Sequence, residues 1–104
     1  MIGMQEGFPI QFSEPELAAI CLRYRVCRLS AFGSVLRSDF SPESDIDLIV
    51  EFEEGRKPGL AFFRLEAELS VLFGRRVDLN TKASLSPYFR DRVLFAARDL
   101  YVAA

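Results

Sequence analysis

The sequence predicts a small α/β domain. The chain has 104 residues, enough for one compact domain with a single core, and half of those residues are hydrophobic. Segments with hydrophobic residues at helical spacing alternate with shorter segments in which every second residue is hydrophobic. No internal repeat or linker interrupts this alternation, so we expect residues 1–104 to form one α/β domain.

The first half of the chain predicts a helix and two strands. Ser13 is a typical helix-capping residue, and the hydrophobic spacing after it extends a helix to about Tyr24. Residues 26–32 alternate and end at a Gly-Ser pair, which indicates a strand that enters a turn and a short helical segment. Residues 45–52 place hydrophobic side chains on one face and predict the second strand.

The second half predicts a helix, a strand and a final helix. Residues 60–73 have helical spacing and end at Gly74, a residue type that often caps the C-terminus of a helix because glycine adopts positive φ freely. Residues 75–80 alternate again and predict a third strand. A last helix is expected from Pro87 to about Leu100.

Composition excludes several function classes. The net charge of −2 indicates that the protein lacks the basic surface that polynucleotide binding needs, so we expect no direct contact with nucleic acid. No hydrophobic run approaches the roughly 20 residues of a membrane helix, and the N-terminus does not resemble a signal peptide, so we expect a cytoplasmic protein without membrane contact. The absence of histidine rules out Ser-His and Cys-His nucleophiles and histidine-bound zinc. Cys21 and Cys27 lack the spacing of a redox or zinc motif and are expected to be buried, reduced thiols.

Three aspartates are candidates for a metal site. Asp45 and Asp47 lie two apart on a predicted strand, so they share a face with roughly 7 Å between their α carbons. Such a pair is either an exposed acidic strand end or a pair of hard oxygen ligands, which suit Mg²⁺. Asp78 lies on the opposite face from Val77 and Leu79, and if the second and third strands pair, the three carboxylates can converge.

Gly33, Ser34 and Arg37 are candidates for phosphate binding. The glycine permits a crowded backbone, free amides at the start of a helical turn can bind phosphate, and Ser34 can donate to a phosphate oxygen. A Gly-Ser pair after a strand is also an ordinary turn. Arg37 could reach the phosphates or form an ion pair with an aspartate.

Taken together, these motifs resemble those of the DNA-polymerase-β-like nucleotidyltransferases, and most closely the minimal nucleotidyltransferase (MNT) family. The motifs are Gly33-Ser34-x-x-Arg37, Ser44-Asp45-Ile46-Asp47-Leu48 and Val77-Asp78-Leu79, and the motif core covers about residues 26–80. The resemblance implies a mixed sheet flanked by helices, two Mg²⁺ ions, and transfer of a nucleoside monophosphate from a nucleoside triphosphate, with ATP as the expected donor. Such an enzyme releases pyrophosphate.

The resemblance also implies a role for each matching residue. Gly33 and Ser34 match the triphosphate-binding turn, and Asp45 and Asp47 match the metal ligands. Asp78 matches a third carboxylate that binds one ion and helps to deprotonate or orient the acceptor hydroxyl. The family often has glycine after the position of Arg37, where this chain has Ser38, so the match is weakest there.

Many small members resemble antitoxins encoded beside a HEPN toxin, whose Arg-x4-6-His ribonuclease motif a histidine-free chain cannot carry. The expected function is therefore Mg²⁺-dependent transfer onto a hydroxyl, such as a tyrosine, of a HEPN-type toxin. One alternative is an antitoxin that neutralises its toxin by binding alone, and another is transfer to a small molecule such as an aminoglycoside. A homo-oligomer is compatible with all three.

Overall fold

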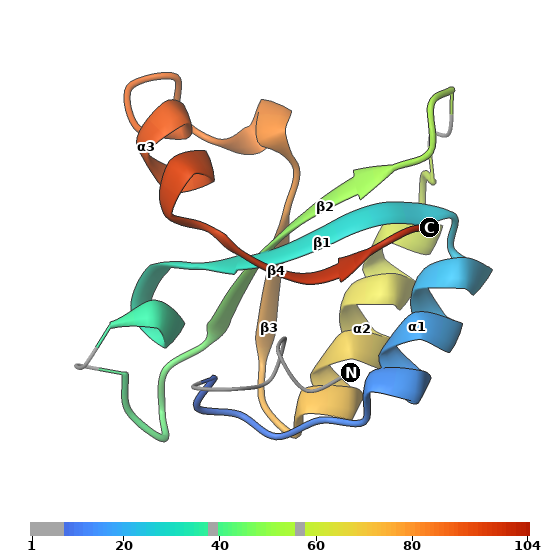
Figure 1. Ribbon diagram of the computed structural model, residues 1–104, viewed down its shortest axis with the longest axis horizontal. Helices are drawn as coiled ribbons and strands as arrows, with labels where there is room; N and C mark the ends of the chain where they lie inside the picture. Colours follow the sequence, from blue (N-terminus) through green and yellow to red (C-terminus); the bar gives the residue numbers. More distant parts are fainter. Residues whose placement is uncertain (1–7, 38–39, 56–57) are drawn as a thin grey trace.

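The computed structural model describes residues 8–37, 40–55 and 58–104, in which a four-stranded sheet is flanked by helices (Figure 1). In chain order the elements are α1 (Glu14–Arg23), β1 (Val26–Phe32), the 3-10 helix η1 (Gly33–Leu36), β2 (Ile46–Phe52), α2 (Ala61–Phe73), β3 (Val77–Asn80), the 3-10 helix η2 (Lys82–Ser84), α3 (Arg90–Ala96) and β4 (Arg98–Val102). The α/β class predicted from the sequence is confirmed.

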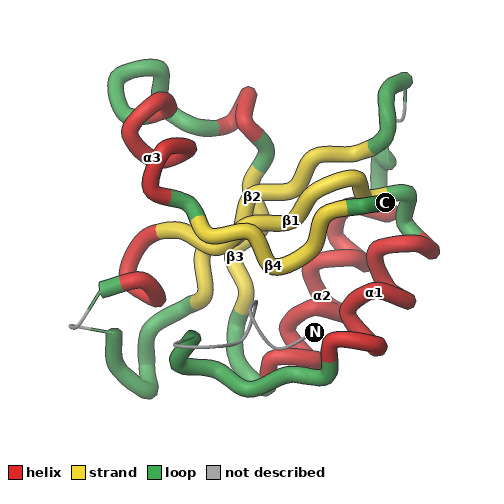
Figure 2. Tube along the Cα trace, in the orientation of Figure 1, coloured by secondary structure: helices red, strands yellow, loops and turns green. Residues whose placement is uncertain are grey.

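The sheet is mixed, with the strand order β3-β2-β1-β4. β1 pairs antiparallel with both β2 and β4, whereas β2 and β3 run parallel and are joined through α2. A parallel pair needs a crossover connection of this kind, because the chain must return to the same edge before the next strand starts. Figure 2 shows the four strands as one curved layer beside α1 and α2.

The two helices that cover one face of the sheet begin and end where the sequence predicts. The Ser13 side chain accepts a hydrogen bond from the backbone N–H of Glu16 at 3.2 Å and so caps α1. Gly74 ends α2 with φ 67°, the left-handed conformation that glycine adopts without strain. The helices lie side by side and are linked at the surface by Arg23 Nη1 and Glu68 Oε1, 2.6 Å apart.

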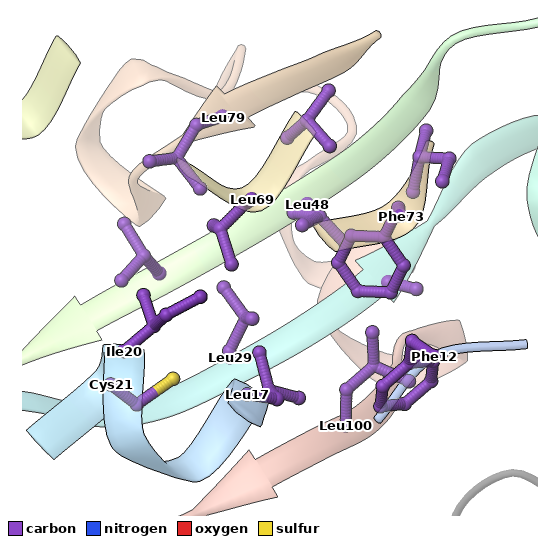
Figure 3. Close-up of a cluster of buried hydrophobic side chains, with 14 of the residues drawn as sticks. Phe12, Leu17, Ile20, Cys21, Leu29, Leu48, Leu69, Phe73, Leu79 and Leu100 are labelled. Atoms are coloured by element: carbon purple, nitrogen blue, oxygen red, sulfur yellow. The ribbon is translucent and has the colours of Figure 1, made fainter. Parts of the chain in front are cut away.

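The hydrophobic core fills the space between this helical layer and the sheet (Figure 3). Leu17 and Cys21 enter it from α1, Leu69 from α2, and Leu29 and Leu48 from the sheet, and all are almost fully buried. Burial raises the pKa of the Cys21 thiol to about 12, because the thiolate would lose its hydration. The expectation of a buried, reduced thiol is confirmed for Cys21.

Cys27 is also a free thiol but is only half-buried. Its Sγ lies 3.6 Å from the carbonyl oxygen of Phe52, on the neighbouring strand. The prediction of two buried cysteines is therefore wrong for this one. The cause is a register shift between Val26 and Arg28, which interrupts the regular alternation of inward and outward side chains in β1.

The predicted final helix from Pro87 to Leu100 is wrong in its second half. The helix α3 covers only Arg90–Ala96, and Ala97 then leaves helical geometry with φ −62° and ψ 145°. The following residues form β4, which pairs with the otherwise open edge of β1 and places Leu100 in the core at 2% exposure. Pairing satisfies the backbone groups of both strands, and this tertiary gain outweighs the local helical pattern.

The other face of the sheet is named here the outer face, because it is turned away from α1 and α2. Ile49 and Ser30 belong to it, and parts of α3 and η2 lie over it at the end of the molecule distant from α1 (Figure 1). Among the described residues, no helix has the length and hydrophobicity needed to cross a membrane.

Candidate active site

Two of the three predicted aspartates face each other on the outer face of the sheet. Asp47 on β2 and Asp78 on β3 are direct partners in the parallel register. Their strand neighbours Ile46, Leu48, Val77 and Leu79 point into the core, so the two carboxylates are turned away from it. The pairing of the second and third strands that the convergence of the acids requires is therefore present.

Asp47 lies in an electrostatically unfavourable position for a carboxylate. Burial raises the pKa of its carboxyl, the negative charges of Asp78 and Asp45 raise it further, and a side-chain hydrogen bond with Asp78 adds to the effect. The positive charge of Arg37 lowers the pKa of Asp47 and opposes these effects in part. Without a bound cation, the site therefore favours retention of a proton.

Gly33 brings the turn after β1 directly against Asp47. Its φ is +75°, and a Cβ added at this position would lie 2.6 Å from Asp47 Oδ2. A Cβ at that separation would force the Asp47 carboxylate to shift, so the absence of a Cβ lets backbone and carboxylate approach each other. Glycine is needed here for two reasons, its positive φ and its lack of a side chain.

The turn continues through Ser34 to Arg37. η1 closes with a hydrogen bond from the Arg37 backbone N–H to the Ser34 carbonyl oxygen at 2.9 Å. Arg37 has extended backbone geometry after the turn, and its charge acts on Asp47. Contact of Arg37 with a phosphate and an ion pair of Arg37 with an aspartate both stay predictions, since its charge can act on Asp47 in either case. Ser38, where the family pattern changes, lies outside the described residues.

Asp45 is not assembled with the other two acids. Its Oδ2 lies 3.9 Å from Arg76 Nε, and both side chains are largely open to solvent. Within the described ranges, no three acidic, cysteine or histidine side chains are close enough together to hold a metal ion as they stand. A like-charged carboxylate is repelled by Asp47 and Asp78, so the nearest cationic side chain becomes its partner.

The residues nevertheless fit a divalent cation. Asp47 and Asp78 present hard oxygen ligands across one strand pair, and Asp45, two residues before Asp47, is held by an ion pair to the exposed Arg76. A cation would neutralise the repulsion that raises the pKa of Asp47. The crowding of Gly33 against Asp47 Oδ2 places the turn that the sequence predicts to bind phosphate next to the same carboxylate.

A second group of polar side chains on the outer face was missed by the sequence interpretation. Ser30 donates from Oγ to Asp99 Oδ1 at 2.7 Å, and Lys82 Nζ lies 3.2 Å from Glu51 Oε1. Asp99 was expected on a helix, whereas it lies on β4 opposite Ser30. Residues 98–102 read Arg-Asp-Leu-Tyr-Val and do not alternate between polar and hydrophobic, so no local pattern identified this strand.

Comparison with known proteins identifies the family. The profile of the nucleotidyltransferase domain family matches residues 16–100. A Methanocaldococcus jannaschii protein that is provisionally named a protein adenylyltransferase is 41% identical over 85 residues, which cover 82% of this chain and 90% of that one. The protein adenylyltransferase MntA of Thermococcus cleftensis is 41% identical over 73 residues, 69% of this chain and 72% of MntA.

Solved structures have the same fold. One, provisionally described as a minimal nucleotidyltransferase, superposes with a TM-score of 0.67 at 39% identity and covers 81% of this chain and 85% of its own. A complex of a tri-AMPylated Shewanella oneidensis HEPN toxin with its MNT antitoxin gives a TM-score of 0.59 at 20% identity, over 86% of this chain and 70% of that one. The second similarity concerns the fold alone. By its sequence, its motifs and its fold, the chain belongs to the nucleotidyltransferase family, as a minimal nucleotidyltransferase.

Proposed function

We propose that this enzyme transfers AMP from ATP to a hydroxyl of a partner protein, and that the partner is a HEPN-type toxin for which this chain is the antitoxin. The observation that carries the proposal is the facing pair Asp47 and Asp78, with Gly33 crowded against Asp47. The proposal is supported by relatives named as protein adenylyltransferases and by the similarity in fold to an MNT antitoxin bound to a HEPN toxin.

Each residue of the site has a role in the proposed reaction. The backbone around Gly33 and the Ser34 hydroxyl hold the triphosphate, and Arg37 balances negative charge at Asp47. Asp45 and Asp47 would hold Mg²⁺ on the triphosphate side, and Asp78 would hold it on the acceptor side, in a site for two ions. The ions supply charge stabilisation to the attacking and leaving oxygens of an in-line displacement.

The bonds formed and broken define what the chain must position. The acceptor oxygen forms a bond to the α-phosphorus, and the bond from that phosphorus to the oxygen bridging to the β-phosphate breaks, so that pyrophosphate leaves. Asp78 lies at the acceptor side and receives or orients the proton that the acceptor hydroxyl loses. Asp47 is the register partner of Asp78 on the neighbouring strand, and as a carboxylate it would hold the α-phosphate only through a bound cation.

A second candidate function is neutralisation of the toxin by binding alone. Two observations favour it: Asp45 pairs with Arg76 rather than with the other acids, and three aromatic side chains around α3 are strongly exposed. Tyr88 is 89% exposed, Phe89 56% and Phe95 94%. Exposed aromatic side chains are typical of surfaces that contact other proteins.

One experiment separates the two functions. The chain is mixed with Mg²⁺, each of the four nucleoside triphosphates and the product of the neighbouring gene, and the partner is weighed by intact mass spectrometry. Transfer predicts an adenylyl increment with ATP and its loss with Asp78→Asn, because a carboxamide binds the ion poorly and does not accept the proton. Glu53→Gln is the control, since it removes an exposed carboxylate 3.8 Å from Arg25 and outside the site. A tight complex in which the toxin is inhibited but carries no nucleotide adduct would favour binding alone.

A further inference from the structure

A polar cavity opens on the outer face of the sheet, beside the aspartate pair. It has a volume of about 90 Å³ and lies between the sheet, η2 and α3. Its polar walls are formed by Arg28, Ser30, Glu51, Lys82 and Asp99. These residues come from four different elements, so the fold itself brings them together.

The contacts within this cavity leave oxygen atoms for a ligand. Asp99 accepts from Ser30 Oγ at 2.7 Å and lies 4.0 Å from Arg28 Nε, and in the described part of the chain both contacts use Oδ1. Glu51 contacts Lys82 through Oε1. Each carboxylate is thus held in place through one oxygen, which leaves Asp99 Oδ2 and Glu51 Oε2 as acceptors for added hydroxyl groups.

Burial and exposure in the cavity suit a binding site. Ser30 is the one buried polar residue among those the structure describes, at 6% exposure, and its hydrogen bond holds the Asp99 carboxylate in place. The side chains of Asp99 and Glu51 are 42% and 30% exposed, so a ligand in solvent can reach them.

The cavity adjoins the proposed triphosphate site along the strands. Ile49, which lines it, follows Asp47 by two residues and therefore points to the same face. Ser30 is the cross-strand partner of Ile49, which makes it a diagonal neighbour of Asp47, and such neighbours lie roughly 7–8 Å apart. A group attached directly to a phosphate held at Gly33 and Asp47 can therefore enter the cavity.

We propose that this cavity binds the ribose of the nucleoside triphosphate through its vicinal diol, with the 2′ and 3′ hydroxyls donating to Asp99 and Glu51. Two carboxylates that line one cavity can each accept a hydrogen bond from a hydroxyl, and carboxylates commonly bind ribose hydroxyls in nucleotide sites. Arg28 Nε, 4.0 Å from Asp99 Oδ1, and Lys82 Nζ, 3.2 Å from Glu51 Oε1, orient the two carboxylates. The inference rests on the proposed function and adds a preference for ribonucleotides over deoxyribonucleotides.

Equilibrium binding tests the inference without requiring transfer. Calorimetry with Mg²⁺ compares ATP, 2′-deoxy-ATP and 3′-deoxy-ATP on the full chain. Hydrogen bonds to charged groups predict that each deoxy analogue binds wild type about tenfold or more weakly than ATP. Asp99→Asn and Glu51→Gln should reduce this preference severalfold, because an amide accepts more weakly than a carboxylate. Glu53→Gln, which disrupts a similar ion pair outside the cavity, should retain it.

The outcomes distinguish this inference from the proposed function. Equal affinity of wild type for all three nucleotides would overturn the ribose site. The proposed transfer would still be tested independently, by the intact mass of the partner protein. If one variant does not fold, the other provides the same comparison, since the two carboxylates lie on different strands. An unchanged preference in the folded variants would also overturn the inference. Failure of any nucleotide to bind would overturn both proposals.

Discussion

Replacement of Gly33 by alanine should separate stability from activity. In the native turn, an alanine Cβ would lie 2.6 Å from Asp47 Oδ2 and 3.4 Å from its Cγ. The carboxylate is the flexible end of a side chain, so it should move away and the fold should persist. The displaced carboxylate would then no longer lie where the proposed metal and triphosphate site needs it.

The magnitude of each effect follows from the geometry. A positive φ costs a non-glycine residue about 1–2 kcal/mol, which for a domain of this size lowers Tm by roughly 5–15 °C. Relief of the contact needs a shift of the carboxylate by roughly 0.5–1 Å, and misplacement by about 1 Å can reduce the rate of a catalysed step about 100-fold. We expect both effects in Gly33→Ala.

Gly74→Ala is the matched control. Gly74 has a similar φ of +67°, but no atom lies within 4 Å of an added Cβ. The two variants should therefore lose similar stability, while only Gly33→Ala should lose transfer. Thermal denaturation measures the first quantity and the rate of partner modification measures the second.

The transfer rates of the two glycine variants decide whether the contact of Gly33 with Asp47 matters for the reaction. If Gly33→Ala retained a transfer rate within about threefold of Gly74→Ala, at similar Tm, the position of the Asp47 carboxylate would not matter for the reaction. The turn after β1 would then be structural, and the triphosphate would have to bind elsewhere.

Three further predictions concern the metal site and the fold. First, the pKa of Asp47 is raised in the folded state, so the metal-free fold binds more protons than the unfolded chain and loses stability as pH rises from the unfolded pKa through the folded one. Asp47→Asn should remove that loss, raise the free energy of unfolding at pH 7 by roughly 0.2–1 kcal/mol and so raise Tm. An unchanged profile of Tm against pH would contradict this prediction. Second, excess chelator should abolish ATP binding measured by calorimetry, because the acids otherwise repel the phosphates; equal affinity in its presence would exclude a metal bridge. Third, Leu100→Ala should cost about 2–5 kcal/mol in chemical denaturation, whereas Val102→Ala, at a 43% exposed position, should cost much less; equal small effects would count against β4 as a core strand.

Much of the fold could be predicted because local signals and tertiary structure agree. Three signals each depend only on residues close together in the sequence: the helix caps at Ser13 and Gly74, and the alternation before Gly33. The region from Pro87 onward is different, since Val93, Ala97 and Leu100 have helical spacing although only the first belongs to α3. The deciding interaction is the pairing of β4 with β1, about 70 residues earlier, which no local pattern reports.

The candidate site could be predicted in part for the same reason. Asp45 and Asp47 are neighbours in sequence, and Asp78 lies between two core residues, so their placement follows from strand periodicity. The contact of Gly33 with Asp47 depends on register across the sheet. Ser30 and Asp99, 69 positions apart, meet only because the last strand returns to β1.

The burial of Cys21 provides a built-in reporter of unfolding. Its thiol has no exposed surface and a pKa of about 12, so in the native state it is both shielded and protonated, whereas alkylation needs an accessible thiolate. In an intact molecule, Cys27 should therefore react first, and modification of Cys21 should proceed only as fast as the core opens. The ratio of doubly to singly labelled protein over time then measures how often the core between α1 and the sheet opens, without any introduced probe.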